Sequence, residues 1–446
     1  MDTIYALSTP PGRGGIAVIR ASGPQACEGL TALSKDNMPL PAPRMASHWT
    51  LRDPKDKNAI LDRAMVIRFV APSSFTGEDC IEYHLHGGTA VVESVLEALS
   101  KLPHHRLAAP GEFTRRAFEN GKMDLTSAEA IADLIHAETQ EQKHQALMQM
   151  GGALEKIYEG WKDRLAHILA LMEADLDFSD QDLPDDLLLK VRPDVSDLLE
   201  QINQHLNDNR RGEILRDGVK IVVLGAPNAG KSSLMNALAR RDVAIVSHVA
   251  GTTRDIIDVH LNLSGYPVIL SDTAGLRPDQ LTNSDHDQIE SEGIRRAIKR
   301  AEESDIKILM YDGTADPDKH TLQLLDNNSI LVRNKSDLLS NAPKISHQEI
   351  TISTKTGDGI DNLLSMISDK IKSKIGQSDT PSLTRQRHRT ALEKTKDALE
   401  RSMTTPLPEL AAEDIRLGVR YLGSITGKID VEDLLDMIFR DFCIGK

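Results

Sequence analysis

The sequence predicts a multidomain chain of mixed α/β and all-α classes, in which an N-terminal α/β domain precedes a helical domain that an inserted P-loop domain interrupts. The 446 residues leave room for about three domains of ordinary size. Strand-like runs fill the first part, and proline-poor helical patterns lie on both sides of a central α/β segment. We therefore expect domains at residues 1–120, 121–214 together with 381–446, and 215–380.

The composition limits the function classes that the chain can belong to. A formal net charge of -14 argues against a general polyanion-binding surface, so contact with nucleic acid must use a local basic patch or a partner's surface. Cys27, Cys80 and Cys443 fit no disulfide framework and no zinc spacing, as expected in a reducing compartment. The sequence shows no signal peptide and no apolar run long enough for a membrane span, so we expect a cytoplasmic protein.

The N-terminal segment has the pattern of an α/β domain. Strands are expected at Ile16–Arg20, Arg63–Phe69 and Asp79–His86, and a helix at Ala90–Ser100. The glycines of residues 11–15 precede a strand instead of following one, which disfavours a dinucleotide-binding fingerprint.

Three polar residues, Glu82, His84 and His86, alternate onto one face of the last of these strands. Such a face could hold a metal ion or another ligand, or it could be a half-solvated polar surface. A zinc site would need further ligands at fitting spacing, which the sequence does not offer.

Helical periodicity dominates the rest of the chain outside the central segment. It runs from about Thr126 to Asp180, resumes over Leu188–Leu206, and returns at Thr390–Met403 and Ala411–Phe439. The simplest interpretation is one helical domain interrupted by an insert. A nucleotide-driven movement in that insert would act on helices from both sides of it.

The insert opens with the strand-like run Val219–Leu224, which leads directly into Gly225-Ala226-Pro227-Asn228-Ala229-Gly230-Lys231-Ser232 and a helical pattern. This is the context that a phosphate-binding loop requires. Its backbone N–H groups converge on the α- and β-phosphates, Lys231 reaches the β/γ-phosphates, and the Ser232 hydroxyl can ligate Mg²⁺.

Further nucleotide motifs follow in order. Asp272-Thr273-Ala274-Gly275 end the next strand, and Thr252 and Thr253 suit a switch that grips the metal only when the γ-phosphate is present. The Asp337 carboxylate of Asn334-Lys335-Ser336-Asp337 can accept hydrogen bonds from guanine N1–H and N2–H₂, and adenine lacks this donor pair. Ser353-Thr354-Lys355 close the set beside the base. Together they predict a Ras-like GTPase domain.

Two features of this domain separate it from the Ras type. Leu276 follows Asp272-Thr273-Ala274-Gly275, so the glutamine that orients water in Ras-type enzymes is missing, and no arginine finger is apparent. Asn228 offers a neutral oxygen near the phosphates, and a bound monovalent cation could take the finger's place. The alternative is that Asn228 only shapes the loop.

The C-terminal Phe442-Cys443-Ile444-Gly445-Lys446 fits a prenylation signal poorly. Cys443 is therefore either an inert thiol or a reactive thiol near a ligand, with Lys446 or the terminal carboxylate as a further contact.

The chain resembles the MnmE (TrmE) family of tRNA wobble-uridine modification GTPases from end to end. The resemblance is carried by residues 10–20, Phe75–Asp79, Pro110–Thr114, Asn120–Leu125, the GTPase motifs and the last five residues. It implies an N-terminal domain that binds tetrahydrofolate and dimerises, a helical domain and an inserted G domain. It also implies a heterotetramer or larger complex with the flavoprotein MnmG, which brings the FAD. Together the partners would add a carboxymethylaminomethyl-type group to C5 of uridine 34 in certain tRNAs.

The resemblance also implies roles for individual residues. Arg20, Glu82, Lys122 and Lys446 match positions that bind 5-formyl- or methylene-tetrahydrofolate, and Cys443 matches a cysteine needed for modification. Asn228, Ser247, Val249 and Thr252 match a K⁺ site, and Ser232 and Thr253 match Mg²⁺ ligands. Glu290 matches the glutamate that orients the attacking water, although the length of the segment before it leaves Glu292 as a rival. The residues expected to contact GTP are Asn228, Ala229, Gly230, Lys231, Ser232, Ser233, Ser247, His248, Val249, Ala250, Gly251, Thr252, Thr253, Asp272, Thr273, Ala274, Gly275, Asn334, Lys335, Asp337, Ser353, Thr354 and Lys355.

Two other function classes remain open at this stage. The same G domain could serve a ribosome-associated assembly GTPase without modification chemistry, or a potassium-sensing signalling switch with no role on RNA. The folate-type residues Arg20, Glu82 and Lys122, together with Cys443, favour the modification enzyme over the first of these.

Overall fold

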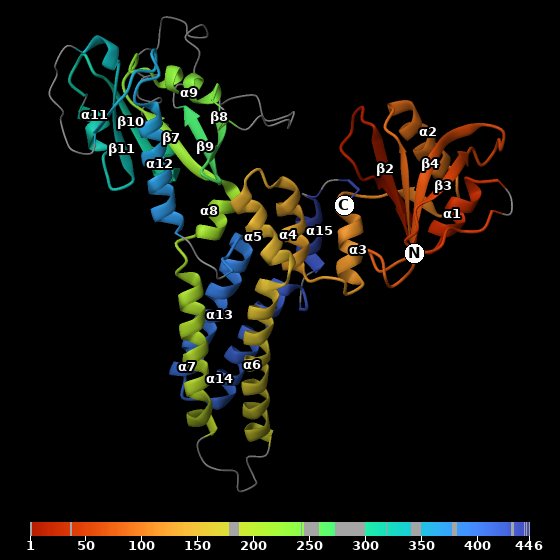
Figure 1. The fold of residues 1–446 in the computed structure, drawn as a ribbon. Helices are drawn as coiled ribbons and strands as arrows, with labels where there is room; N and C mark the ends of the chain where they lie inside the picture. The colour runs from red at the N-terminus through yellow and green to blue at the C-terminus, as the bar shows by residue number, and fades with distance from the viewer. Residues whose placement is uncertain are drawn as a thin grey trace, which may run out of the picture. The chain divides into compact units, whose positions relative to one another are not determined.

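The structure is a computed structural model. It describes residues 2–35, 38–177, 187–241, 243–244, 258–272, 299–317, 319–339, 349–376, 381–429, 432–440, 442 and 444–445. The chain forms two compact units, the first of Met1–Ala132, Gln149–Leu188 and Thr404–Lys446, and the second of Asp133–Met148 and Leu189–Met403 (Figure 1). An N-terminal α/β region, a helical region and a second α/β region between helices all occur, as the fold class predicted from the sequence requires. Among the described helices, none is both long enough and apolar enough to cross a membrane.

The first unit contains a six-stranded sheet in the order β3-β4-β5-β2-β1-β6. The strands are β1 (Thr3–Leu7), β2 (Ile16–Ser22), β3 (Ser47–Arg52), β4 (Ile60–Phe69), β5 (Cys80–His86) and β6 (His105–Leu107). All pairings are antiparallel except that of β1 with β6. The strands expected at Ile16–Arg20, Arg63–Phe69 and Asp79–His86 are thus confirmed, with small shifts at their ends.

The two faces of this sheet differ because side chains alternate along each strand. Ile19, Tyr83 and Leu85 belong to a buried core that includes Val95 and Leu99 of helix α2 (Thr89–Ser100), the helix expected at Ala90–Ser100. Helix α1 (Ala26–Ala32) contributes to the same core. The opposite face carries Arg20 of β2 paired in register with Glu82 of β5.

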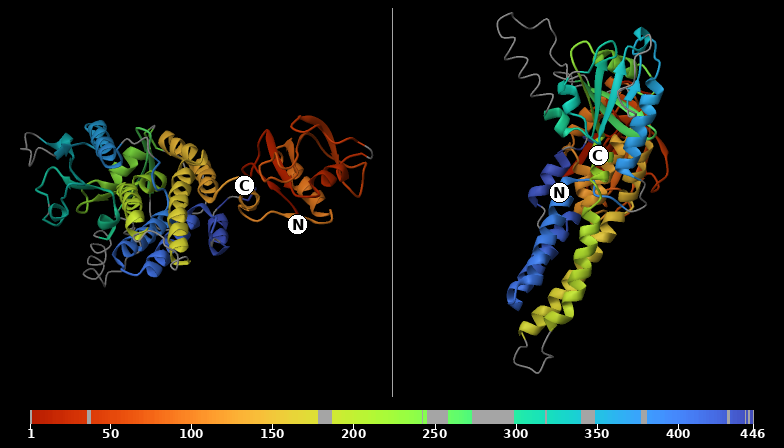
Figure 2. Two further views of the ribbon diagram at one scale, coloured as in Figure 1. Left: turned by 90° about the horizontal axis from the view of Figure 1, so that it is seen from below. Right: turned by 90° about the vertical axis from the view of Figure 1, so that its left-hand side faces the viewer.

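The helical part of the first unit has a small core and a long helix pair. Helix α3 (Glu112–Glu119), helix α4 (Leu125–His136) and helix α15 (Glu432–Arg440) meet around Leu125, Phe439 and Phe442. Helices α6 (Ala153–Asp177) and α14 (Pro408–Thr426) lie side by side (Figures 1 and 2). Gly427 ends α14 in the left-handed conformation, at φ 87°, which favours glycine.

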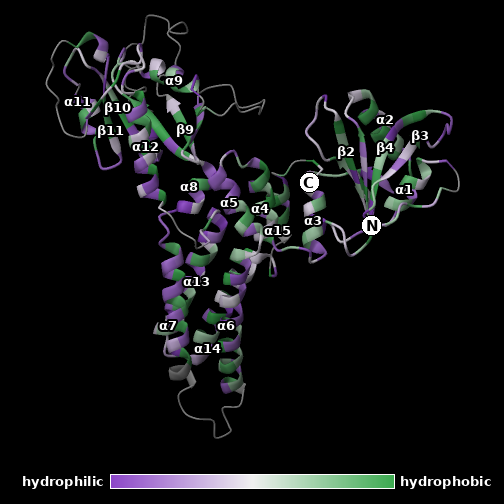
Figure 3. Ribbon diagram, in the orientation of Figure 1, coloured by the Kyte–Doolittle hydropathy of each residue, from purple (hydrophilic) through white to green (hydrophobic). Residues whose placement is uncertain are grey.

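The second unit contains a six-stranded sheet in the order β12-β11-β10-β7-β9-β8. Its strands are β7 (Val219–Leu224), β8 (Asp258–Leu263), β9 (Tyr266–Asp272), β10 (Ile306–Asp312), β11 (Ser329–Asn334) and β12 (Glu349–Thr351). All pairs are parallel except β8 with β9, and the strands are largely hydrophobic (Figure 3). Parallel strands end at one edge of a sheet, and ligands of such folds bind at the carboxyl ends.

Helices complete the second unit. Helix α9 (Lys231–Ala239) and helix α12 (Ile360–Ile375) pack on the sheet through Leu234, Leu238, Leu363 and Ile367. A shorter helix, α11 (Lys319–Gln323), follows β10. The unit also holds helix α8 (Arg211–Asp217) and most of three other helices, which are α5 (Gln140–Met150), α7 (Leu187–Leu206) and α13 (Gln386–Thr404).

Candidate functional site

The phosphate-binding loop predicted from the sequence lies between the end of β7 and the start of α9, at the carboxyl edge of the sheet. Its glycines have backbone conformations that other residues rarely adopt, with φ 149° at Gly225 and 102° at Gly230. A Cβ atom at Gly225 would lie 1.9 Å from the Met310 carbonyl oxygen, and one at Gly230 would lie 2.1 Å from Asn334 Nδ2. Both positions therefore require glycine, and the loop delivers its N–H groups and the N-terminus of α9 to the same edge.

The Lys231 ammonium is folded back over this loop. Its Nζ donates to the carbonyl oxygens of Gly225, at 2.8 Å, and Ala226, at 3.0 Å. Phosphate oxygens bound by the loop would offer the same ammonium charged acceptors in place of these neutral carbonyls. The side chain is therefore held at the place where β- and γ-phosphates are expected.

The base-reading residues lie beside the loop. Asn334 Nδ2 donates to the Ala229 carbonyl oxygen at 2.9 Å, and Asn334 Oδ1 accepts from the Thr354 N–H at 3.1 Å. The hydroxyl of Ser353, which is fully buried, donates to Asp337 Oδ1 at 2.7 Å. This contact orients the carboxylate that is expected to read guanine.

Asp312 contacts this site through Lys335, and its contact was not among those predicted from the sequence. It ends β10 and accepts from Lys335 Nζ at 2.5 Å, and this hydrogen bond is the main cause that lowers the pKa of Asp312 to about 2. Lys335 itself has a left-handed backbone, at φ 64°. The only signal in the sequence was the position of Asp312 at the end of an apolar strand.

One cavity joins the phosphate side to the base side. Its volume is about 760 Å³, within the usual range for small-molecule sites. The predicted GTP contacts that line it are Asn228, Gly230, Lys231, Ser232, Ser233, Asn334, Lys335, Asp337, Thr354 and Lys355. Ala229 and Ser353 contact these residues through the hydrogen bonds given above.

Several predicted site residues lie outside the described part of the chain. They are Ser247, His248, Val249, Ala250, Gly251, Thr252, Thr253, Thr273, Ala274, Gly275, Glu290, Glu292, Cys443 and Lys446. For Asp272 only the backbone is described, at the end of β9 opposite Val223. Their roles stay predictions.

The polar face of the first sheet brings two of the predicted folate residues together. Arg20 donates to Glu82 Oε1 from Nε at 3.2 Å and from Nη2 at 3.0 Å. The Arg20 guanidinium lies 5.3 Å from the centroid of the Phe75 ring and 5.8 Å from that of Phe113, within the range of cation–π contacts. Nothing in the sequence assigned the two rings to Arg20, because they come from a loop and a helix far apart in the chain.

Lys122, the third predicted folate residue, borders the loop that carries Phe75. Its Nζ donates to the Pro72 carbonyl oxygen at 2.9 Å. Near the chain end, the Gly445 carbonyl oxygen accepts from Ser8 Oγ at 3.0 Å, and a Cβ at Gly445 would lie 2.2 Å from the Leu7 carbonyl oxygen. The C-terminal segment is therefore packed closely against the end of β1.

The histidines on this face lie beside carboxylates, but only His86 has a hydrogen-bond partner on its ring among the described residues. His84 Nε2 lies 3.4 Å from Glu82 Oε2, and His86 Nδ1 lies 2.8 Å from Asp62 Oδ1. Within the described ranges, no group of three or more His, Cys, Asp and Glu side chains is arranged to hold a metal ion. The zinc alternative for this strand therefore gains no support.

A second cavity, of about 620 Å³, lies between α3 and α15 and is lined by Arg106, Arg115, Arg116 and Arg440. Its carboxylates are Glu78, Glu112, Glu119 and Asp436, and each accepts from an arginine. Because the lining charges balance, we do not assign an anion site to it.

Comparisons with known proteins decide the family. Residues 3–122 match the family model of the GTP-binding protein TrmE N-terminus, and residues 125–443 match that of the MnmE helical domain. The tRNA modification GTPase MnmE of Parvibaculum lavamentivorans is 50% identical over 450 residues, covering 100% of both chains. The chain belongs to the MnmE family of tRNA modification GTPases.

A mitochondrial protein is also similar to this chain over its whole length. The mitochondrial 5-taurinomethyluridine-[tRNA] synthase subunit GTPB3 of Danio rerio is 45% identical over 476 residues, covering 100% of this chain and 93% of its own. Among solved structures, the G domain of the T. maritima FeoB iron transporter is 24% identical, covers 35% of this chain and 98% of its own, and has a TM-score of 0.24. With so low a TM-score, this likeness carries no argument.

Proposed function

We propose that this protein hydrolyses GTP and couples the hydrolysis to modification of tRNA in the cytoplasm. The observation that carries the proposal is the single cavity that joins the Lys231 phosphate loop to the Asp337 base reader, in a chain of the MnmE family.

Guanine specificity follows from the position of Asp337. An ionised carboxylate accepts hydrogen bonds only, and guanine offers two donors, N1–H and N2–H₂, that a carboxylate can receive together. The Ser353 hydroxyl donates to Asp337 Oδ1, which holds the carboxylate in one orientation for this pair. Adenine would leave the carboxylate oxygens without these donors inside the complex, at a cost in affinity.

Hydrolysis requires positive charge near the β/γ-phosphates, and we propose that K⁺ supplies it. Asn228 belongs to the phosphate loop and lines the nucleotide cavity, and its amide oxygen is the ligand that it would offer to K⁺. Ser247, Val249 and Thr252 would complete the K⁺ site. Ser232 and Thr253 would hold Mg²⁺, and Glu290, or its rival Glu292, would orient the attacking water.

Pairing of two G domains would shield this site from water, which strengthens the electrostatic stabilisation of the developing charge. We propose a homodimer for this reason, in addition to dimerisation through the N-terminal domain.

For the N-terminal domain we propose a pocket for a reduced folate, either 5-formyl- or methylene-tetrahydrofolate. Arg20, held by Glu82 and by the rings of Phe75 and Phe113, presents a fixed cation beside apolar surface. A folate combines an aromatic pteridine with a carboxylate tail. The pteridine would contact the apolar surface, and the carboxylate would pair with the cation. Lys122 and Lys446 would add positive charge for the tail.

The modification itself would need a redox partner. We propose that the flavoprotein MnmG supplies FAD in a heterotetramer or larger complex, and that Cys443 acts in the modification. The product would be a carboxymethylaminomethyl-type group on C5 of uridine 34. The Danio rerio relative is named a synthase subunit, which supports action within a complex. A net charge of -14 is compatible with tRNA binding if the partner provides the basic surface.

Nucleoside analysis of tRNA from cells that lack this protein tests the proposal. We expect the C5 group at the wobble position to disappear and to return with a plasmid copy. Intact wobble nucleosides together with defective ribosome assembly would favour the alternative, a ribosome-associated assembly GTPase.

A further inference from the structure

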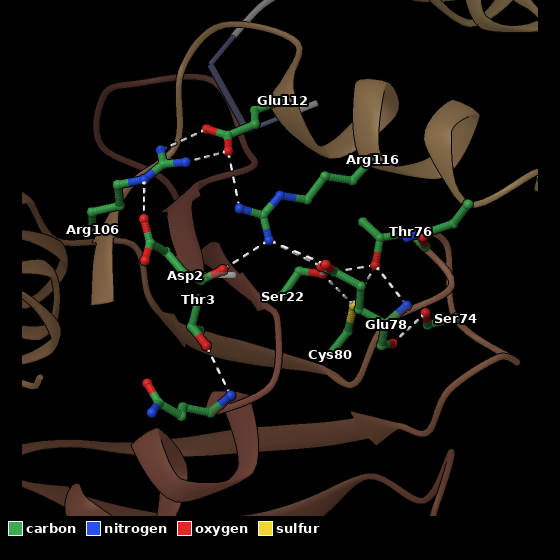
Figure 4. A network of polar contacts seen from close by, with 12 residues as sticks. Asp2, Thr3, Ser22, Ser74, Thr76, Glu78, Cys80, Arg106, Glu112 and Arg116 are labelled. Carbon is green, nitrogen blue, oxygen red and sulfur yellow. Dashed lines mark hydrogen bonds and ion pairs between the residues drawn. The ribbon is translucent and has the colours of Figure 1, made fainter. Parts of the chain in front are cut away.

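A chain of ion pairs connects Arg106, Glu112, Arg116 and Glu78 in the first unit (Figure 4). Arg106 donates to both carboxylate oxygens of Glu112, at 2.6 and 2.8 Å. Arg116 Nη2 donates to Glu112 Oε1 at 3.1 Å, and Arg116 Nη1 lies 3.2 Å from both carboxylate oxygens of Glu78. Arg116 therefore bridges two carboxylates, which the planar fork of a guanidinium can do and a lysine ammonium does poorly.

Glu78 anchors the loop that leads from β4 to β5. Its Oε2 accepts from Ser22 Oγ at 2.6 Å, and its backbone carbonyl accepts from Ser74 Oγ at 2.5 Å. Ser22 lies two residues after Arg20 on β2, so the two side chains leave the same face of the strand. The anchor is thus next to Arg20 on the sheet.

Arg116 joins the two elements that bring aromatic rings to Arg20. Phe75 lies in the loop that Glu78 anchors, and Phe113 lies one helical turn before Arg116 on α3. Asn120, just after α3, adds a second connection, because its Nδ2 donates to the Thr76 carbonyl oxygen at 2.8 Å.

Burial makes the central pair sensitive to the loss of either partner. The exposed fractions of the Arg116 and Glu78 side chains are 12% and 13%. A charge that is this buried and has lost its partner is not solvated by water, which is unfavourable. The loop would therefore rearrange to expose or re-pair the charge.

We propose that Glu78 and Arg116 are positioning residues, which hold Phe75 and Phe113 against the Arg20 guanidinium and thereby set the affinity of the pocket for a reduced folate. The inference rests on the proposed folate pocket. Neither residue needs to touch the ligand, because each acts through the two rings and the loop.

The test is a calorimetric titration of 5-formyltetrahydrofolate into the full-length protein. We expect Arg116→Lys and Glu78→Gln each to weaken the affinity by about tenfold or more, as loss of a supporting contact behind a binding site commonly does. The matched control is Arg115→Lys. Arg115 is the neighbouring residue on α3, but it pairs with Glu119 at 2.9 Å and with Asp436 at 2.6 Å instead of Glu78. Its substitution should leave the affinity within twofold of the parent.

One further measurement and the choice of a second variant separate positioning from a general loss of structure. At saturating folate, the circular dichroism of the bound pteridine should change shape in Arg116→Lys and keep the parent's shape in Arg115→Lys. Glu78→Gln keeps the size of the side chain, so it serves as the second variant if Arg116→Lys does not fold.

The outcomes distinguish this inference from the proposal on which it rests. A parent protein that binds no reduced folate would overturn the folate pocket itself. A parent that binds, with Glu78→Gln and Arg116→Lys equal to it in affinity and in pteridine dichroism, would overturn the positioning role alone.

Discussion

The side-chain amide of Asn334 donates a hydrogen bond of 2.9 Å to the carbonyl oxygen of Ala229, which ties the base-reading loop to the phosphate loop. The same amide accepts from the Thr354 N–H through its oxygen, so both of its polar atoms are engaged between two loops. Gly230 leaves no room for a Cβ atom at this point, since that atom would lie 2.1 Å from Asn334 Nδ2. The loop that binds the phosphates and the loop that reads the base are therefore held together by a direct hydrogen bond.

Asn334→Asp should weaken GTP binding by about tenfold or more. The substitution replaces the donor by a carboxylate oxygen that faces the Ala229 carbonyl, and the lost bond plus the unpaired acceptor is worth about 1–3 kcal/mol. Titration of a fluorescent GTP analogue measures the effect. Asn328→Asp is the control, because it adds the same charge at an exposed turn before β11. Equal affinity in the parent and both variants would contradict the link.

Asp337→Asn should shift the preference from guanine to xanthine nucleotide. The amide oxygen still accepts from N1–H, but the amide N–H then faces the guanine N2 amino group, which also donates. Xanthine has an oxygen acceptor in place of that amino group. Competition between GTP and XTP in binding assays measures the shift. Ser353→Ala should weaken GTP binding more mildly, since it removes only the contact that orients Asp337. A variant that still prefers GTP would show that another residue reads the base.

Much of the fold was predictable from local patterns. The apolar runs of β7 and β9–β11 and the alternation along β2 and β5 have the periods of strands, and the phosphate loop needs its glycines for backbone reasons. The helical pattern expected from about Thr126 to Asp180 is confirmed by three helices between Leu125 and Asp177, and residues 178–180 lie outside the described part of the chain. It breaks into α4, α5 and α6, with one break at the left-handed Gly152, φ 77°.

The contacts that complete the sites could not be predicted in the same way. The Arg20 pocket needs Phe75 and Phe113, the base site needs Asp312 beside Lys335, and Gly445 packs against Leu7 across nearly the whole chain. Each contact joins residues distant in sequence, so it depends on how the strands are ordered. The periodicity of one segment carries no information on that order.

Arg389→Ala should destabilise the second unit strongly. Arg389 of α13 donates to Glu213 of α8 at 2.8 Å and to Asp208 at 2.7 Å, and the side chains of the three are about a tenth exposed or less. Removing one partner of a buried ion pair typically costs about 3–5 kcal/mol. Calorimetry should show a transition lowered by roughly 6 °C or more. Lys396→Ala is the control, because it removes a more exposed pair with Glu400 on the same helix.

The destabilisation should depend on pH in a defined direction. Burial raises the pKa of the Glu213 carboxyl, but hydrogen bonds from Arg389 and Arg210 outweigh burial and hold this pKa below the ordinary value of 4.5. A carboxyl whose pKa is depressed by folding contributes stability above its unfolded pKa and loses it as the pH falls through the folded value. The difference between Arg389→Ala and the parent should therefore be full at pH 7 and shrink below about pH 4.5. A constant difference from pH 7 to pH 3 would show that packing, not charge, is responsible.

The choice of variant matters for the proposed K⁺ site, because Asn228 has a left-handed backbone at φ 64°. Asparagine tolerates this conformation, whereas alanine would add roughly 1–2 kcal/mol of backbone strain. Asn228→Ala therefore strains the backbone of the loop in addition to removing the side-chain oxygen. Asn228→Gly removes the oxygen and accepts the same φ, so it separates the two effects.

GTP turnover should be faster in K⁺ than in Na⁺ at equal ionic strength, and Asn228→Gly should abolish most of that difference. Leu276 cannot orient water and no arginine finger is apparent in the sequence, so a bound cation must offset the charge that develops on the β/γ-phosphates. Oxygen ligands fixed at K⁺ distances leave Na⁺ underbound, and loss of such a contact costs about 10²-fold in rate. GTP affinity should persist, since the loop amides and Lys231 still hold the phosphates. Steady-state rates in the two salts measure the K⁺ stimulation, and a nucleotide titration measures the GTP affinity. Equal turnover in both salts, or full K⁺ stimulation in Asn228→Gly, would show that the charge comes from elsewhere.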